Sequence, residues 1–164
     1  MSDTTVTGLS DLNALLQTLP VKFEKNILKG ALRAGMKPVL IDAKAGASVA
    51  SGVMRAGLKV SANSKGGQVT ASIKAKGKHG FLANFVEYGT AAHRISAEAG
   101  GALSFGGSVV RHVDHPGQRA RPFMRPALDS QAGAALLATG EYIKKRLAEK
   151  HGMDTADIQI GGTE

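Results

Sequence analysis

The sequence contains no cysteine and no tryptophan, and aromatic residues make up only 4% of its 164 residues. The absence of cysteine excludes disulfide bonds, zinc–thiolate sites and thiol catalysis, and it is compatible with a reducing compartment. With so few aromatic residues, the core must consist mainly of Ala, Val, Ile and Leu. A hydrophobic content of 43% is typical of a globular protein, and the length suits a single domain.

The chain also lacks the hydrophobic segments that direct a protein to a membrane or through it. No basic segment followed by an apolar segment opens the sequence, and no apolar run approaches the roughly 18 residues of a membrane-spanning helix. We therefore expect a protein that is not exported through a signal peptide and has no membrane partner.

Acidic residues are missing between Asp42 and Glu87, within a chain whose net charge is +8. The basic residues of this interval are Lys44, Arg55, Lys59, Lys65, Lys74, Lys76 and Lys78. A second basic cluster consists of Arg111, Arg119, Arg121 and Arg125. A surface of one sign predicts an anionic partner, either nucleic acid or an acidic protein surface. The alternative is that these charges serve only solubility.

Hydrophobic periodicity predicts three helices. Ser10 and Asp11 are suited to cap a short helix that ends before Pro20. A long helix follows, with a kink or break expected at Pro38, and a second long helix is expected from Pro122 to Lys150. Its apolar stripe comprises Met124, Leu128, Ala132, Ala135, Leu136, Thr139, Ile143 and Leu147. His151-Gly152 is predicted to end this helix.

Period-two alternation predicts two half-buried strands at 54–62 and 69–76, joined by a hairpin loop at 63–67. Their solvent faces are predicted to be basic. The segment 81–88 is apolar on both faces, which favours a more central strand and leaves a short helix as the alternative. Phe81, Phe85 and Tyr88 are expected in the core.

A Gly-rich segment at 91–120, which we call the arm, connects these strands to the last helix. Long connections inside a compact domain are uncommon and tend to be functional or mobile. Short strand-like pieces flank Gly106-Gly107, which predicts a small projecting β-ribbon. The expected fold class is α+β: a small antiparallel sheet packed by a long N-terminal helix and a long C-terminal helix. The domain is predicted to span 1–152, followed by a flexible tail at 153–164.

Known catalytic arrangements are not matched by the polar residues. Thr90, His93 and Glu87 are close in sequence, but no Gly-x-Ser-x-Gly nucleophile elbow accompanies them. His112 and His115 lack the further ligands of a closed metal site. No Gly-rich stretch matches a nucleotide-binding motif. We therefore predict no catalytic, cofactor-binding or metal-binding residues, and an interaction protein rather than an enzyme.

Two motifs resemble a known family. Phe-Val-Glu-Tyr-Gly-Thr at 85–90 and Arg-Pro-Phe-Met-Arg-Pro-Ala-Leu at 121–128 occur in this order after a Gly-Leu-x-x-Leu-x-x-Leu opening. His-Pro-Gly at 115–117 lies between them. In this respect the chain is similar to the tail-completion or head–tail joining (neck) proteins of long-tailed bacteriophages, described as minor-tail-protein-Z-like.

The resemblance implies a structural virion protein without catalytic residues, assembled in the host cytoplasm and located in the tail or neck. Its implied partners are other tail and head-connector proteins and further copies of itself in a homo-oligomeric ring. The candidate interaction residues are Glu87, Gly89, Thr90, His93, Phe105, Arg111, His115, Arg119, Arg121, Phe123 and Arg125. The candidate basic face, which would contact neighbouring protein or passing DNA, is Arg55, Lys59, Lys74, Lys76 and Lys78.

Two alternatives remain open at this point. A small nucleic-acid-binding protein would use the same basic faces, and its affinity for DNA would fall steeply with salt. An enzyme with a loop-borne His/Glu site would lose a defined activity on replacement of His93 or Glu87.

Overall fold

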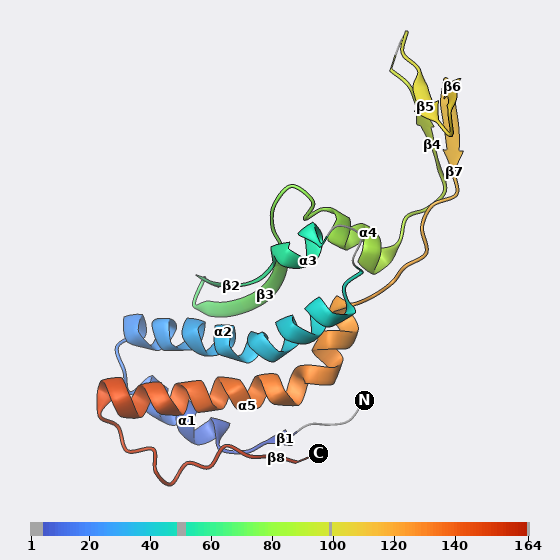
Figure 1. The fold of residues 1–164 in the computed structure, drawn as a ribbon. Helices are drawn as coiled ribbons and strands as arrows, with labels where there is room; N and C mark the ends of the chain where they lie inside the picture. The colour runs from blue at the N-terminus through green and yellow to red at the C-terminus, as the bar shows by residue number, and fades with distance from the viewer. Residues whose placement is uncertain (1–4, 49–51, 99, 164) are drawn as a thin grey trace.

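The computed structural model describes residues 5–48, 52–98 and 100–163, and it shows the α+β fold expected from the sequence (Figure 1). Two long antiparallel helices, α2 (Val21–Gly46) and α5 (Met124–His151), form the centre of the body. A two-stranded sheet covers one side of α2, and the short helix α1 (Leu9–Gln17) lies beside α5. No helix among the described residues is long and apolar enough to cross a membrane.

Glycine allows the two long helices to approach closely. A Cβ atom at Gly35 of α2 would collide with Thr139 and with the carbonyl of Ala135 on α5, and one at Gly30 would collide with Tyr142. Two core clusters result. One holds Val39, Ala43, Ala47, Met54, Leu58, Ala83, Phe123 and Ala127, and the other holds Leu12, Leu16, Ile27, Ala31, Ile143 and Leu147. The core is therefore mainly aliphatic, as predicted from the composition.

The sheet consists of β2 (Leu58–Lys65) and β3 (Gln68–Ala75), which pair antiparallel. The predicted alternation is confirmed within β2, where Leu58 and Ala62 are buried and Lys59 is exposed. The predicted start of the first strand at residue 54 was wrong, because residues 53–57 form the helical turn α3 (Val53–Gly57). The hairpin loop is also shorter than expected: Gly66 and Gly67, at φ 58° and 81°, make the turn alone.

The segment predicted as a central strand is the helix α4 (Leu82–Tyr88), so the alternative interpretation was correct. Phe81, Phe85 and Tyr88 are spaced by four and three residues, which places them on one side of a helix. That side is open to solvent, with 57%, 44% and 66% of these residues exposed. The expectation that they belong to the core was therefore wrong, and Ala83 and Glu87 occupy the buried side instead.

The helix ends differ in detail from the predictions. Gly8 rather than Ser10 precedes α1, without a side-chain cap, and α2 continues through Pro38 without a break. The last helix begins at Met124 rather than Pro122, and it ends at His151. The predicted stop at His151-Gly152 is therefore confirmed, with Gly152 in a left-handed conformation. Leu128 and Leu136 were wrongly assigned to the buried stripe, since they are 48% and 41% exposed.

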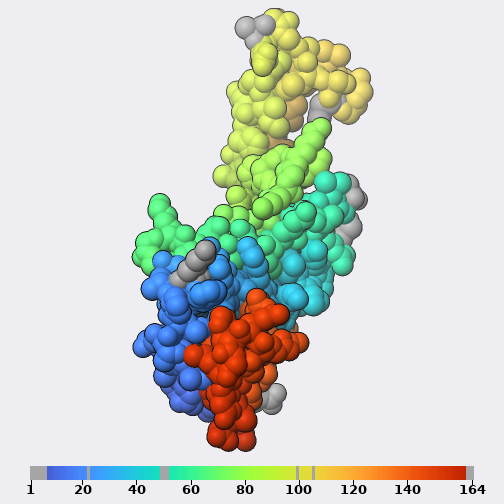
Figure 2. All heavy atoms as spheres, turned by 90° about the vertical axis from the view of Figure 1, so that its left-hand side faces the viewer, coloured from blue at the N-terminus to red at the C-terminus, as the bar shows by residue number. Residues whose placement is uncertain are grey.

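The arm is a β-ribbon that projects from the body, as predicted, and both views show it extending beyond the helices (Figures 1 and 2). At its base, β4 (His93–Ser96) pairs with β7 (His112–His115). Nearer the tip, β5 (Leu103–Phe105) pairs with β6 (Ser108–Val110) around the Gly106-Gly107 turn. The side chain of Phe105 lies outside the described part of the structure.

The two ends of the described chain meet in a small terminal layer beneath α5. There β1 (Thr5–Val6) pairs with β8 (Gly162–Thr163), and Ile158 and Ile160 pack against the second core cluster. The sequence did not predict these contacts. Flexibility of the tail at 153–164 in solution stays a prediction.

Candidate interaction site at the base of the arm

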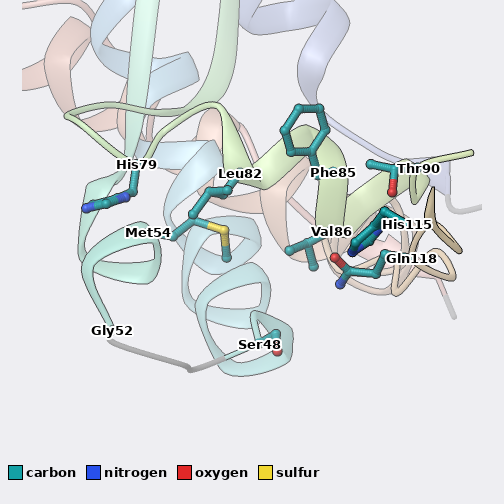
Figure 3. Close-up of a pocket in the computed structure, with 10 residues that line it drawn as sticks. All are labelled: Ser48, Gly52, Met54, His79, Leu82, Phe85, Val86, Thr90, His115 and Gln118. Carbon is teal, nitrogen blue, oxygen red and sulfur yellow. The ribbon is translucent and has the colours of Figure 1, made fainter. Parts of the chain in front are cut away.

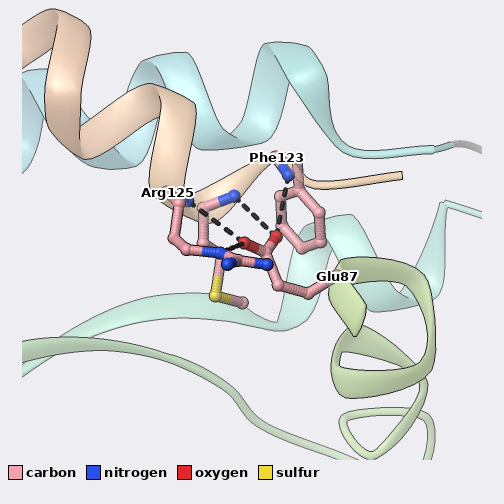
Figure 4. A network of polar contacts seen from close by, with 4 residues as sticks. Glu87, Phe123 and Arg125 are labelled. Atoms are coloured by element: carbon pink, nitrogen blue, oxygen red, sulfur yellow. Dashed lines mark hydrogen bonds and ion pairs between the residues drawn. The ribbon is translucent and has the colours of Figure 1, made fainter. Parts of the chain in front are cut away.

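A single buried carboxylate, that of Glu87, connects the arm to the body. Glu87 is at the end of α4 with only 3% of its surface exposed. Its Oε2 accepts hydrogen bonds from the backbone N–H groups of Phe123 (2.8 Å) and Met124 (2.9 Å). Its Oε1 accepts one from the N–H of Arg125 (3.2 Å) and one from the Arg125 Nε (3.1 Å) (Figure 4). Glu87 therefore caps α5, a helix to which it does not belong.

The sequence at the start of α5 explains why this cap is needed. The first four N–H groups of a helix have no intrahelical partner, and in α5 these belong to residues 123–126. Pro126 carries no N–H, and the other three donors all bind Glu87. Phe123 stands where a capping Ser, Thr, Asp or Asn would usually be, so the acceptor must come from elsewhere in the chain. The Arg-Pro-Phe-Met-Arg-Pro segment thus depends on the Glu of the other motif.

The environment of Glu87 favours its charged form. Burial raises the pKa of this carboxyl group, but the hydrogen bonds from Met124, Phe123 and Arg125 outweigh burial and leave the pKa below its ordinary value of 4.5. A negative charge at this position is also stabilised by the positive end of the α5 dipole. A carboxylate held this way is a structural acceptor, and its hydrogen-bonding capacity is used within the fold.

Gly89 allows the two chain segments at the base of the arm to approach each other closely, two residues after Glu87. It has φ 74° and ψ −175°, and a Cβ there would lie 2.5 Å from the Gln118 carbonyl oxygen and 2.8 Å from the Ala120 nitrogen. Next to it, Thr90 and Gln118 exchange two backbone hydrogen bonds of 2.9 and 3.0 Å. The positive φ and the close approach together require glycine at this position.

An aromatic surface on α4 flanks this junction. Phe81 and Phe85 are in edge-to-face contact with ring centroids 5.9 Å apart. The guanidinium of Arg125 lies 4.9 Å from the centroid of the exposed Tyr88 ring. Exposed aromatic side chains that form one patch often mark an interaction surface. We call Phe81, Phe85 and Tyr88 the aromatic face.

A cavity of about 350 Å³ opens beside the aromatic face, between α3, α4 and the base of the arm (Figure 3). Its apolar wall includes Met54, Leu82 and Val86, and Thr90 and His115 come from the arm side. The rings of His93 and His115 lie across the β4–β7 pair with centroids 5.1 Å apart. His115 Nδ1 accepts a hydrogen bond from the Gly117 N–H, and His93 Nδ1 contacts the Ala91 carbonyl. His93 and Glu87 therefore make their hydrogen bonds to different groups, and the structure shows no hydrogen bond between the two side chains among the described residues.

The other predicted site residues are distributed along the arm and its base. Arg111, Arg119 and Arg121 are exposed, and the Arg121 N–H donates to the Val86 carbonyl at 2.7 Å. Phe123, by contrast, is buried in the core at 3% exposure. The exposed members of the predicted set can contact a partner directly, whereas Glu87 and Phe123 hold the site in place.

The predicted basic face is exposed in all five members. Lys59 and Lys74 are directly opposite each other on β2 and β3. Arg55, Lys76 and Lys78 follow at the end of the sheet nearest α4. Within the described ranges, the ion pairs join Arg94 to Asp114, Arg125 to Glu87 and Lys145 to Glu149, so none of them involves this face. The Arg94–Asp114 pair lies on the arm, where the hydrogen bond from Arg94 lowers the pKa of Asp114.

Comparison with protein families bears on the body of the molecule. Residues 10–89, from α1 to the glycine after α4, match the model of the HK97-gp10-like family, described as "Bacteriophage HK97-gp10, putative tail-component". This part of the chain resembles a bacteriophage tail component. The match supports the resemblance seen in the sequence. It ends where the arm begins, and it covers just under half of the chain. No curated protein and no solved structure gave a significant match.

Proposed function

We propose that the protein is a structural component that completes the bacteriophage tail and joins it to the head, as a homo-oligomeric ring at the neck. The family match to a tail component supports a place in the virion. The observation that carries the finer role is the arm: a ribbon projecting from a body to which it is firmly attached at the base. A projecting element of this kind has little to pack against in its own chain and is suited to contact a neighbour.

The arm is the proposed assembly element. In the described structure, β4 pairs with β7 and β5 with β6, and no further strand joins either pair. Their outer edges can therefore accept a strand from another chain, which is a common mode of protein recognition. Ile95 and Val109 add exposed apolar side chains to the arm, at 40% and 76% exposure. In a ring, the arm of each copy would lie on the next copy.

Arg111, Arg119, Arg121 and Arg125 would contact acidic surface on the neighbouring copy or on the adjacent tail or connector protein. The role is thus structural rather than catalytic, with assembly in the host cytoplasm. The polar residues at the base of the arm support this role, because Glu87 serves α5 and His93 contacts His115.

The test compares the mass of the protein in solution over a concentration series with that of a variant lacking residues 93–114. We expect a concentration-dependent ring for the full chain and a folded monomer for the deletion. A second variant lacking only 98–110, which keeps the β4–β7 pair, would show which part of the arm is needed. If the full chain is a ring and the deletion leaves it unchanged, the arm is not the assembly element.

A nucleic-acid-binding role is the second candidate, because the basic face has no carboxylate partner in the described residues. It predicts that the purified protein binds a DNA duplex with an affinity that falls steeply between 50 and 200 mM salt, by roughly 10³-fold or more if several phosphates are contacted. Tight DNA binding by a monomer that never assembles would favour this function over the neck ring.

A further inference from the structure

The outer face of the β2–β3 sheet carries only basic and neutral polar side chains. We call this the basic sheet face; it shares only Lys59 and Lys74 with the candidate basic face described above. Its members are Lys59, Ser61, Asn63, Lys65, Gln68, Thr70, Ser72 and Lys74. Lys59 and Lys74 are direct cross-strand neighbours, an arrangement that destabilises a sheet unless an anion compensates it. No acidic residue of the interval 43–86 can do so, because none occurs there.

The chain segments of the terminal layer carry the opposite charge, and the ammonium group of Lys144 from α5 lies against them, where it donates to the Ile158 carbonyl. In the described parts of the two terminal segments, residues 5–21 and 152–163 contain no lysine or arginine, and they hold Asp11, Asp154 and Asp157. The pairing of β1 with β8 and a hydrogen bond from the Thr7 N–H to the Gly161 carbonyl (2.9 Å) bring these two segments together. Asp11, Asp154 and Asp157 are all exposed.

The two charged surfaces cannot meet within one molecule. The sheet lies on one side of α2, and α5 with the terminal layer lies on the other, so both helices separate them (Figure 1). A second copy can bring them together. Because the surfaces are different and lie on opposite sides, each copy can use both at once, which generates a head-to-tail contact that closes into a ring or continues as a filament.

We propose that the basic sheet face of one copy docks on the terminal layer of the next copy. The inference rests on the proposed neck ring and assigns it a second contact, separate from the arm. Charge complementarity between two faces of the same chain is the observation that favours this occupant. A DNA duplex would account for the basic sheet face alone and would leave the terminal layer without a role.

Charge reversal tests the contact. One variant carries Lys59→Glu and Lys74→Glu, and a second carries Asp154→Lys and Asp157→Lys. The control for the lysine variant is Arg33→Glu with Lys37→Glu, which makes the same change in net charge as that variant at two exposed positions of α2. Self-association is measured by analytical ultracentrifugation at two salt concentrations, and circular dichroism checks the fold of every variant.

We expect each reversed variant to associate at least about tenfold more weakly than the wild-type chain, because like charges then face each other. The control should associate as the wild type does. A mixture of the two reversed variants, and a chain that carries all four substitutions, should associate again, because opposite charges are restored across the contact. Wild-type association should weaken at higher salt.

Three outcomes would overturn the inference. In the first, both reversed variants associate as the wild type does, whereas deletion of residues 93–114 abolishes association. This result would contradict only the contact proposed here and would still support the neck ring. The second is a loss of DNA affinity in the lysine variant without any effect on association, which would assign the face to DNA. The third is a wild-type chain that stays monomeric at the highest soluble concentration. If that monomer still completes isolated tails, the proposed function survives without the inference.

Discussion

Replacing Glu87 with alanine removes one acceptor from three backbone N–H groups at once. A helix cap contributes about 1 kcal/mol, and a buried donor left without an acceptor costs about 1–3 kcal/mol. The Phe123 N–H is buried, whereas those of Met124 and Arg125 are partly accessible to water. We therefore expect the free energy of unfolding to fall by about 3 kcal/mol. For a chain of this length, that corresponds to a melting temperature lower by about 6–12 °C.

The pH dependence gives a sharper form of the same prediction. Because the pKa of Glu87 is lowered in the folded state, its contribution to stability is fully present above the unfolded pKa and is lost as the pH falls through the folded pKa. Glu87→Gln keeps an acceptor oxygen without the charge. The difference in unfolding free energy between wild type and this variant should therefore be largest near neutral pH and should shrink below pH 4.5.

Urea denaturation, followed by circular dichroism at pH 7 and at pH 3.5, measures both effects. Glu141→Ala is the matched control, because Glu141 is an exposed carboxylate on α5. A Glu87→Ala variant with the wild-type midpoint, or a difference between wild type and Glu87→Gln that does not change with pH, would refute the capping role.

Three further predictions follow from the same region. Gly89→Ala should lower the unfolding free energy, measured in urea, by at least about 2 kcal/mol, because Gly89 has a positive φ and lies close to Gln118. Gly100 also has a positive φ, of 80°, but has open space around it, so Gly100→Ala should lower the unfolding free energy by only about 1 kcal/mol. Replacing Phe81 and Phe85 together with serine should leave the circular dichroism spectrum unchanged and weaken assembly in sedimentation, if the aromatic face contacts a partner; unchanged assembly would argue against this contact. Arg94→Ala should leave the urea midpoint unchanged, because its ion pair on the arm is exposed.

The parts of the fold that sequence patterns could predict are those with a clear period. Alternation around Lys59 and Lys74 identified β2 and β3, and the spacing of Ile27, Ala31 and Val39 identified α2. The segment 81–88 has apolar residues on all sides, so no period distinguished a strand from a helix. Its exposed aromatic face has no counterpart in any sequence rule, because large apolar residues are normally assigned to the core.

The role of Glu87 was only partly predictable. The sequence identified Glu87 as a candidate interaction residue, whereas the structure shows that it caps α5 and pairs with Arg125. The partners are 36 residues apart, so no local rule connects them. One signal did exist: Phe123 directly precedes α5 and Pro126 lies in its first turn, and no side chain there could accept hydrogen bonds from the free N–H groups. A helix start of this kind calls for a remote acceptor.

The length of α5 has a consequence for the geometry of an assembly. With 28 residues in one unbroken helix, α5 is about 42 Å long, and it joins the capped base of the arm to the start of the tail at Gly152. It acts as a fixed spacer, because a helix is stiff along its axis. An insertion of one or two residues would also rotate one end about the axis, whereas a full turn would mainly lengthen the spacer. In an assembly that makes contacts near both ends of α5, the number of helical turns therefore sets the distance between the two contact sites of one copy.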